Sequence, residues 1–347
     1  MTTTNNPLSH FQVSTLFNVQ DLTCVVTGGS SGLGLYAAHA LASNGALVYI
    51  LGRRQSLLDS TVSDFNRLFP DTSLRNNGEL VAVQADITSK TSLISAREFI
   101  ESDLVKRDRK GVQVLVCNAG IAGKFLRSYG QESSSSSPDT KSQESKDQEF
   151  GEIVEELWSF TESDCSSILE TNITGNYLSA LCFLPLLKEG TSPSYLSQTI
   201  LISSNAAWSK LPILNPIYNI SKTAVSHLGQ ILSTMFCDHG LRTNVIEPGL
   251  YPSDLTSTES RDPVTGHYKL SHTNGANIPI GRCGKPEEHA GAVLYLASRN
   301  SMFANGTTMR VDGGALQKVS KTIPSLSKAF PCFCYPFIDR HYSMGFR

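Results

Sequence analysis

The chain has 347 residues, of which 40% are hydrophobic and 17% are charged, and its formal net charge is −2. These values are ordinary for a globular protein and give no electrostatic argument for nucleic acid or an anionic membrane as a partner. No apolar run approaches the ~20 residues of a membrane-spanning helix, so no membrane span is expected. The eight cysteines show no Cys-x-x-Cys spacing, which predicts no metal site and favours a reducing, cytoplasmic location.

Short β-rich runs alternate with helical stretches along most of the chain. Apolar strands between helices are typical of a parallel sheet covered on both faces, so we predict an α/β fold with a doubly wound parallel sheet of the Rossmann type. Its ligand crevice should lie beyond the C-terminal ends of the strands. The expected strands lie at 22–29, 46–52, 80–87, 112–120, 198–207, 242–249 and 307–314. The expected helices lie at 33–45, 91–106, 164–187, 216–240 and 286–298.

Two segments depart from this alternation. We expect one domain at 19–316, between an N-terminal segment at 1–18 and a C-terminal tail at 317–347. Inside the domain, residues 128–150 are rich in Ser, Gln and charge and poor in apolar side chains. Because such a segment buries too little apolar surface to offset the entropy of ordering, we predict a disordered insert. The tail is aromatic and interrupted by prolines, and the sequence does not indicate its role.

A tyrosine and a lysine, Tyr218 and Lys222, are four positions apart in an expected helix and therefore share one face. A tyrosine ordinarily titrates near ~10, and a fixed cation a few ångströms away favours the phenolate. We therefore expect Lys222 to lower the pKa of Tyr218 toward neutral pH, where the phenol can exchange a proton with a substrate. The alternative is an ordinary surface pair, because this spacing is common.

A glycine-rich turn, "TGGSSGLG" at Thr27–Gly34, lies between the first expected strand and the first expected helix. Glycines permit a tight turn and a close approach of backbone to a phosphate, and a helix N-terminus offers free N–H groups to an anion. A plain strand–helix connection needs one glycine rather than four. The turn therefore predicts a phosphate-binding site.

Together these motifs resemble those of the short-chain dehydrogenase/reductase family, in the subtype with a T-G-x-x-x-G-x-G cofactor turn and a Y-x-x-x-K active site. The resemblance covers residues from about 19 to 316. Its further motifs are "ADIT" at Asp86, "NAG" from Asn118, "ETNITG" around Asn172, "ISS" ending at Ser204, "EPGLYPSDLT" and "VDGG".

The resemblance implies a role for each of four catalytic residues. Tyr218 is the general acid/base, Lys222 lowers its pKa and holds the nicotinamide ribose, and Ser204 hydrogen-bonds the substrate carbonyl oxygen. Asn172 anchors a water that connects Lys222 to solvent, the alternative being a helix-surface amide. Ser203 is the rival of Ser204, which is preferred as the last polar residue of its strand. The implied cofactor-binding residues are Gly28, Ser30, Ser31, Gly32, Leu33, Gly34, Arg53, Asp86, Asn118, Tyr218, Lys222, Pro248, Gly249, Tyr251 and Ser253.

The second expected strand ends at Gly52, a position that decides between the two nicotinamide cofactors. An acidic residue there would bind the adenine-ribose 2′-hydroxyl of NAD and repel a 2′-phosphate. Arg53 and Arg54 follow instead, and a guanidinium matches phosphate geometry. We therefore predict NADP(H), held mainly by Arg53. The alternative is that both arginines are merely solvated.

The function implied by the resemblance is that of an NADP(H)-dependent ketoreductase or alcohol dehydrogenase. The substrate would be a small, moderately apolar carbonyl or alcohol compound, held by the segment at roughly 250–280, and a role in specialised metabolism is compatible with this activity. A homodimer or homotetramer through the helices around Asn172 and Tyr218 is also implied. An epimerase or dehydratase of the extended subtype would need glycine at Ser31. A non-catalytic dinucleotide sensor or scaffold is the alternative from a different class.

Overall fold

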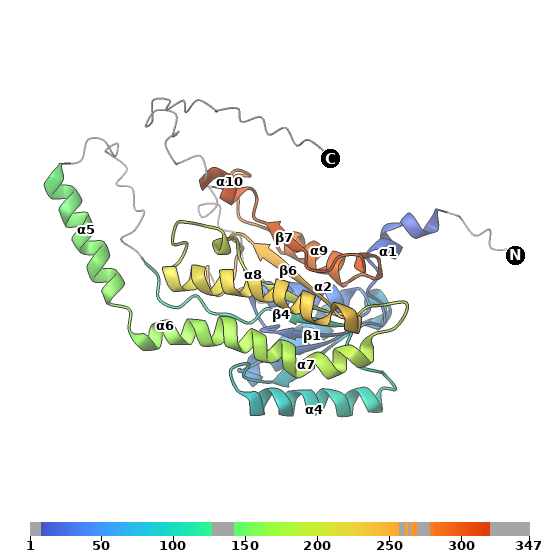
Figure 1. The fold of residues 1–347 in the computed structure, drawn as a ribbon. Helices are drawn as coiled ribbons and strands as arrows, with labels where there is room; N and C mark the ends of the chain where they lie inside the picture. The colour runs from blue at the N-terminus through green and yellow to red at the C-terminus, as the bar shows by residue number, and fades with distance from the viewer. Residues whose placement is uncertain (1–7, 127–141, 257–260, 263–264, 269–277, 320–347) are drawn as a thin grey trace, which may run out of the picture.

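The sheet has seven parallel strands in the order β3-β2-β1-β4-β5-β6-β7 (Figure 1). The computed structural model describes residues 8–126, 142–256, 261–262, 265–268 and 278–319. All seven expected strands are confirmed, and so is the doubly wound class. The strands are β1 (Thr23–Thr27), β2 (Leu47–Gly52), β3 (Glu79–Gln84), β4 (Val114–Cys117), β5 (Gln198–Ile202), β6 (Arg242–Pro248) and β7 (Thr308–Val311).

Helices cover both faces of the sheet, as continuous apolar strands require. One core contains Leu41 of α2, Phe65 of α3 and Val293 of α9. The other contains side chains of α4, α7 and α8. The helices are α1 (Val13–Leu16), α2 (Gly32–Ser43), α3 (Gln55–Leu68), α4 (Lys90–Lys106), α5 (Gln143–Trp158), α6 (Glu162–Leu169), α7 (Asn176–Gly190), α8 (Pro216–Phe236), α9 (Pro286–Ala297) and α10 (Ala315–Val319). A π-helical turn at Glu170–Gly175 joins α6 to α7.

The strand order reverses between β1 and β4, which both leave the sheet at the same edge. A crevice forms where neighbouring connections diverge in this way. The connection after β1 enters α2, on one face of the sheet. The chain after β4 continues on the other face, toward α6 and α8, so the two connections diverge. The predicted ligand crevice therefore lies between the glycine turn and the N-terminus of α8.

The N-terminus of α8 is fixed by Asn215. Its side chain accepts a hydrogen bond from the backbone N–H of Tyr218 at 2.8 Å, and Pro216 occupies the first helical turn. The same amide donates to the carbonyl oxygens of Ala122 and Lys124, in the segment that follows β4. Such a cap satisfies one of the free N–H groups at the helix start. It also ties the first turn of α8, which carries Tyr218, to the edge of the sheet.

Four helices were not expected from the sequence: the short α1 and α10 and the longer α3 and α5. For residues 143–150 the prediction of a disordered insert is wrong, because they form the first half of α5. The remainder of that insert lies outside the described residues apart from Ser142. The first apolar side chain of α5 is Phe150, which is also the last residue of the expected insert. The boundary drawn from composition therefore divided the helix in two, and its helical periodicity was not recognised. Most of the tail, from residue 320, also lies outside the described residues.

No helix in the described parts of the chain combines the length and the apolar character that crossing a membrane requires.

Candidate active site

In the glycine turn the backbone adopts conformations and close contacts that a side chain would prevent. Gly28 has φ +66° and Gly32 has φ +51°, both in the left-handed region that glycine tolerates best. A Cβ on Gly34 would lie 2.2 Å from the carbonyl oxygen of Gly28, so α2 can begin this close to the turn only with glycine there. The N-terminus of α2 therefore presents free N–H groups to the crevice, as an anion site requires.

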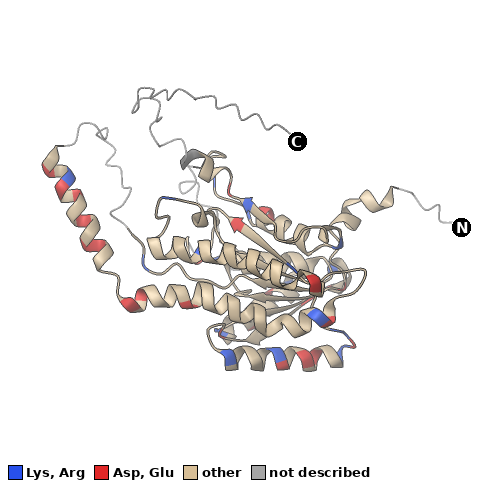
Figure 2. Ribbon diagram, in the orientation of Figure 1, with Lys and Arg blue, Asp and Glu red and all other residues tan. Residues whose placement is uncertain are grey.

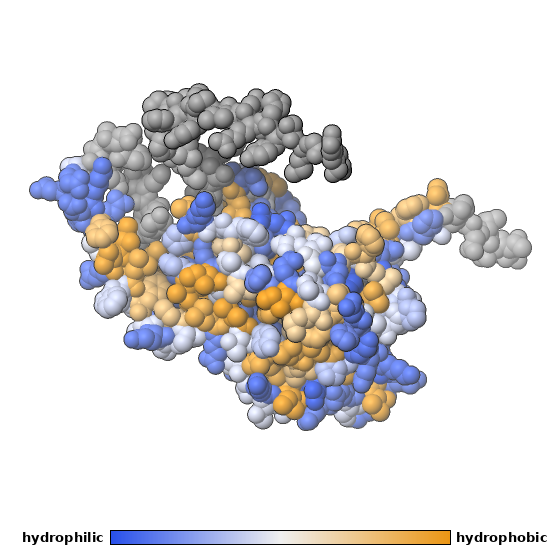
Figure 3. Space-filling view, in the orientation of Figure 1, coloured by the Kyte–Doolittle hydropathy of each residue, from blue (hydrophilic) through white to orange (hydrophobic). Residues whose placement is uncertain are grey.

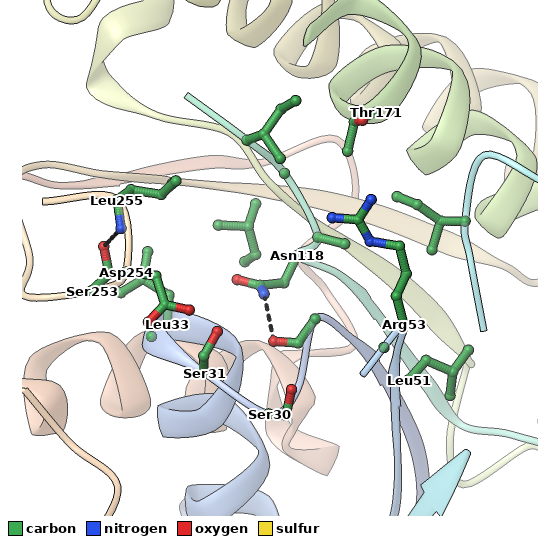
Figure 4. Close-up of a pocket in the computed structure, with 18 of the residues that line it drawn as sticks. Ser30, Ser31, Leu33, Leu51, Arg53, Asn118, Thr171, Ser253, Asp254 and Leu255 are labelled. Carbon is green, nitrogen blue, oxygen red and sulfur yellow. Dashed lines mark hydrogen bonds between the residues drawn. The ribbon is translucent and has the colours of Figure 1, made fainter. Parts of the chain in front are cut away.

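The end of β4 is attached to this turn. The Thr27 hydroxyl accepts hydrogen bonds from the backbone N–H groups of Asn118 and Ala119 at 3.0 and 3.1 Å. The Asn118 amide donates in return to the carbonyl oxygens of Thr27 and Gly28. Figure 4 shows Asn118 on the wall of the crevice with Ser30 and Ser31 below it. Asn118 thus holds β1 and β4 at a fixed separation beneath the site.

Charged side chains follow β2 and β3 at the far end of the crevice. Asp86 accepts hydrogen bonds from the backbone and hydroxyl of Thr88 at 2.9 and 2.8 Å. Burial acts to raise the pKa of Asp86, but these bonds and the charge of Arg53 outweigh it and hold the pKa below its usual value. The Arg53 guanidinium extends into the cavity on the side of Thr171 (Figure 4). Arg54 instead reaches Asp254 at 3.4 Å.

The structure brings Tyr218, Lys222 and Ser204 together at the other end. The Ser204 side chain lies beside the Tyr218 phenol and acts to lower its pKa. The Lys222 Nζ lies 5.7 Å from the centroid of the Tyr218 ring and donates to the carbonyl oxygen of Ile202 at 3.1 Å. All three side chains are buried. The alternative of an ordinary surface pair is therefore wrong.

The two adjacent serines differ in what their hydroxyls contact. The Ser203 hydroxyl donates to the backbone carbonyl of Lys222 at 2.7 Å and accepts from Ser226 at 2.8 Å, which attaches β5 to α8. The Ser204 hydroxyl caps the short turn that follows β5 and faces Tyr218. Ser203 is thus committed to packing, and Ser204 is the hydroxyl available beside the phenol.

The expected direction of the Tyr218 pKa is not what the structure shows. Burial raises the pKa of Tyr218 to about 12, and the hydrogen bond to Ser204 lowers it only in part. Burial also lowers the pKa of Lys222 to about 8. The prediction overlooked that Lys222 and Tyr218 are buried together, where loss of hydration disfavours both charged forms. At neutral pH the phenol is therefore protonated and the ammonium is still charged.

Asn172 lies fully buried in the π-helical turn, so the alternative of a helix-surface amide is wrong. Its Oδ1 accepts from the backbone N–H of Ile121 at 2.8 Å, and its Nδ2 donates to Ile121 and to Ser221. A Cβ on Gly120 would lie 3.0 Å from Asn172 Oδ1 and 3.5 Å from Lys222 Nζ. Asn172 therefore positions the backbone beside Lys222, and its role as the anchor of a water stays a prediction.

One cavity of about 390 Å³ joins the two ends of the crevice. Its lining includes Gly28, Ser30, Ser31, Gly32, Leu33, Arg53, Asp86, Asn118, Tyr218, Lys222 and Ser253 among the expected residues. The expected residues that do not line it are Gly34, Asn172, Ser204, Pro248, Gly249 and Tyr251. Tyr251 packs instead against Gly284 and His289. A glycine cradle, a helix N-terminus and a buried Tyr–Lys pair in one elongated cavity fit a nicotinamide dinucleotide.

Several residues of the site were not predicted. Asp254 accepts from Arg54 and from Arg261, the latter at 2.6 Å, and so connects the segment after β6 to the end of β2. Asn215 and Thr27 position Tyr218 and Asn118 through hydrogen bonds and have no catalytic role themselves. The Asx cap before Pro216 was a readable signal for Asn215. Nothing in the sequence pairs Asp254 with residues far along the chain.

Comparison with known proteins agrees with this geometry. A sequence profile described as "Enoyl-(Acyl carrier protein) reductase" matches residues 150–315. "Short-chain dehydrogenase/reductase PhomF" of Diaporthe leptostromiformis is 32% identical over 306 residues, which cover 87% of this chain and 93% of the relative. The rhamnolipids biosynthesis 3-oxoacyl-[acyl-carrier-protein] reductase of Pseudomonas aeruginosa is 27% identical over 301 residues, 86% of this chain and 97% of the relative.

A solved structure, "Pseudomonas aeruginosa RhlG/NADP active-site complex", is similar with a TM-score of 0.66 and 25% identity, covering 86% of this chain and 98% of that one. Fold, site and relatives thus define an oxidoreductase of the dinucleotide-binding α/β class. The chain belongs to the short-chain dehydrogenase/reductase family.

Proposed function

We propose that the protein is an NADP(H)-dependent ketoreductase or alcohol dehydrogenase. The observation that carries this proposal is the Tyr218 phenol, beside Ser204 and Lys222, at one end of the cavity that begins at the glycine turn. A protonated acid beside a charged ammonium supports binding and protonation of a carbonyl oxygen at this position. Such an arrangement serves reduction of a carbonyl and, in reverse, oxidation of an alcohol.

The chain's own residues act on the carbonyl oxygen. When bound, the reduced nicotinamide supplies a hydride to the carbonyl carbon. The Ser204 hydroxyl donates to the carbonyl oxygen and orients it, and Tyr218 transfers its phenolic proton to that oxygen as negative charge develops. The Lys222 ammonium stabilises the phenolate left on Tyr218, which then regains its proton from solvent. Asn172 serves this return path by binding the backbone N–H of Ile121, which holds the neighbouring Gly120 beside Lys222.

The preference for NADP(H) rests on the residues around the end of β2. Gly52 offers no carboxylate, Arg53 extends into the cavity, and Ser30 lies 3.6 Å from where a Cβ on Gly52 would be. A guanidinium and a hydroxyl suit a 2′-phosphate. Asp86 is already bound to Thr88, so it competes weakly with a phosphate for Arg53. The similar P. aeruginosa structure is an NADP complex, which supports the same choice.

The proposed substrate is a small, moderately apolar carbonyl or alcohol compound. Leu255 and Ile121 line the cavity beside polar residues, which favours a partly apolar ligand. The similarity to the P. aeruginosa reductase of rhamnolipids biosynthesis supports a role in specialised metabolism. We also propose a cytoplasmic location, where reduced NADP(H) is available to a reductase.

We further propose that the protein is a homodimer or homotetramer. Exposed apolar side chains lie along α7 and α8: Tyr177, Ile220, Ile231 and Met235. Figure 3 shows hydrophobic surface in this region. An apolar surface of this kind is typical of an interface between subunits. Light scattering at micromolar concentration tests this, and a monomer would contradict it.

The alternative of a non-catalytic sensor or scaffold binds the dinucleotide without turning over a substrate. Loss of NADPH absorbance, followed with a panel of ketones and aldehydes, separates the two functions. A reductase consumes NADPH with at least one carbonyl compound, and Tyr218→Phe removes this while it leaves NADPH affinity unchanged. A sensor binds NADPH equally in both forms and consumes none.

A further inference from the structure

Helix α5 carries an apolar stripe that the rest of the described chain does not cover. The stripe consists of Phe150, Ile153, Val154, Leu157 and Trp158, spaced as one face of a helix. Phe150 is 69% and Trp158 88% exposed, and no side chain of α5 is buried. The helix stands away from the sheet and its covering helices (Figure 1), with hydrophobic surface on the part nearer to α6 (Figure 3). We call these five residues the apolar face of α5.

This helix needs a partner to be stable. Isolated helices of about this length are marginal in water, and most helical stability comes from packing an apolar face. Its C-terminal end is attached where the Lys124 ammonium donates to the Ser159 hydroxyl at 2.6 Å. Phe150 and Trp158 are exposed on one helix face, so they form a continuous apolar patch. Single exposed apolar residues are common on protein surfaces, but such a patch usually marks an interaction site. These properties favour a partner from outside the described residues for the apolar face of α5.

The charge of α5 restricts what that partner can be. Figure 2 shows acidic residues along the helix. They are Glu144, Asp147, Glu149, Glu152, Glu155 and Glu156, against the single basic residue Lys146. Pairing with α5 of a second copy would bring two strongly negative helices together, which costs free energy. The partner should be apolar and basic.

The C-terminal segment 320–347 of the same chain has both properties. Its apolar residues include Phe330, Phe333, Tyr335, Phe337 and Ile338. Its basic residues, Lys321, Lys328, Arg340 and Arg347, outnumber the single acidic residue Asp339. We propose that segment 320–347 binds the apolar face of α5.

The covalent connection makes this binding favourable. The last described element, α10, ends at Val319. A segment of this length can extend to roughly 90 Å, which exceeds the dimensions of a domain of this size. A tethered segment also meets its site at an effective concentration of about a millimolar, so a weak contact suffices. Charge attraction orients the segment, and burial of aromatic side chains supplies most of the affinity.

Trp158 reports directly on this contact. In a Trp208→Phe background it is the only tryptophan, because the chain has two. With segment 320–347 bound, Trp158 emission should lie to the blue and resist acrylamide. Removal of residues 320–347 should shift the emission to the red and increase the quenching constant at least threefold. Unchanged emission and quenching would overturn the proposal.

Point substitutions in the full chain guard against a folding failure of the deletion. Val154→Asp should expose Trp158 as the deletion does, whereas Val105→Asp on α4, also at an exposed valine, should not. Replacing the four basic residues of the segment by Glu should have the same effect as Val154→Asp. If Val154→Asp and Val105→Asp leave Trp158 equally protected, the contact does not exist.

A peptide of residues 320–347, added to the deletion variant, provides the direct binding measurement. It should restore the blue emission with an affinity that falls with salt, and a scrambled peptide should bind at least tenfold more weakly. Equal binding of the scrambled peptide would overturn the proposal. So would a blue shift in the deletion variant that grows with protein concentration, because a second copy would then cover the helix.

Discussion

The two ends of the cavity are built in different ways. At the dinucleotide end, backbone groups and glycines set the geometry: the Thr27 hydroxyl binds two N–H groups of the β4 connection, and Gly34 allows α2 to begin against Gly28. At the catalytic end, around Tyr218, side chains join segments far apart in the sequence, as Asn215 does with Ala122 and Lys124. Where backbone contacts set the geometry, few residue types fit a position, so the geometry can be predicted from sequence motifs. Where side-chain contacts set it, many residue types fit, and no motif results.

The largest effect should come from Tyr218, at the catalytic end of the cavity. Tyr218→Phe keeps the ring and removes the proton donor, so turnover should fall by roughly 10²–10⁴-fold. NADPH affinity, which depends on the dinucleotide end, should stay within about twofold. Steady-state kinetics and a fluorescence titration of NADPH measure the two quantities. Retention of most of the turnover would contradict the assignment of Tyr218.

Arg53 tests whether the far end of the cavity selects the cofactor. Arg53→Ala should weaken NADPH binding by about 2–3 kcal/mol, because a charge-assisted hydrogen bond to phosphate is worth this much. NADH affinity should hardly change, and Arg53→Lys should keep part of the NADPH affinity. Calorimetric titration with both cofactors measures the difference. An equal loss for both would make Arg53 a structural residue.

Gly34 and Gly291 provide a matched pair for the backbone-built end. An added methyl group at Gly34 would lie 2.2 Å from a backbone oxygen, whereas at Gly291 in α9 it would meet nothing within 4 Å. Gly34→Ala should therefore lower the free energy of unfolding by about 1–3 kcal/mol. Gly291→Ala should raise it by about 1 kcal/mol, from helix propensity. Urea unfolding measures both, and similar values for the two would contradict the close approach at Gly34.

Lys222 sets the alkaline limit of the reaction. Because burial lowers its pKa to about 8, the ammonium that stabilises the Tyr218 phenolate is lost as the pH rises through that value. The kcat/KM for reduction should be level below pH 8 and fall about tenfold per unit above it. A guanidinium stays protonated there, so Lys222→Arg should lack this limb even if its maximal rate is lower. If kcat/KM of Lys222→Arg still falls above pH 8, the fall is caused by the titration of another group.

The same lowered pKa gives a stability prediction with a definite sign. The unfolded lysine keeps its ordinary pKa of 10.5, so unfolding takes up a proton between about pH 8 and pH 10.5. The free energy of unfolding should therefore rise with pH through this window in wild type relative to Lys222→Met. Urea unfolding at a series of pH values measures it.

The smallest effect should follow a change in the segment at 128–141. Replacing it by a short Gly/Ser link should change the free energy of unfolding by less than about 1 kcal/mol, since each doubling of loop length costs roughly 0.6 kcal/mol. NADPH affinity should be unchanged. A deletion reaching into α5 should behave differently, because it removes the apolar face proposed above. Loss of turnover in the shorter variant, with cofactor binding intact, would show that the segment serves the catalytic end.

The contrast between the two ends also explains which parts of the structure were predictable. All seven strands could be read from apolar runs, since a strand buried on both faces has little choice of residue. Gly34, Asn118 and Ser204 could be placed by motif because backbone contacts demand them. The joint burial of Tyr218 and Lys222 could not be read from the sequence, and burial raises the pKa of Tyr218 where a lowered pKa was expected. Helix α5 was missed because its acidic face dominates its composition and its apolar face lacks a partner in the described chain.

The most direct test of the central claim is the transfer of deuterium from the cofactor to a substrate. Wild-type protein would be incubated with NADPH deuterated at the nicotinamide C4, once for each stereoisomer, and a carbonyl compound that it consumes. The account predicts an alcohol one mass unit heavier, with deuterium on the former carbonyl carbon, from one stereoisomer only, and almost none with Tyr218→Phe. Product formed without deuterium from either stereoisomer, or equally well by Tyr218→Phe, would contradict it.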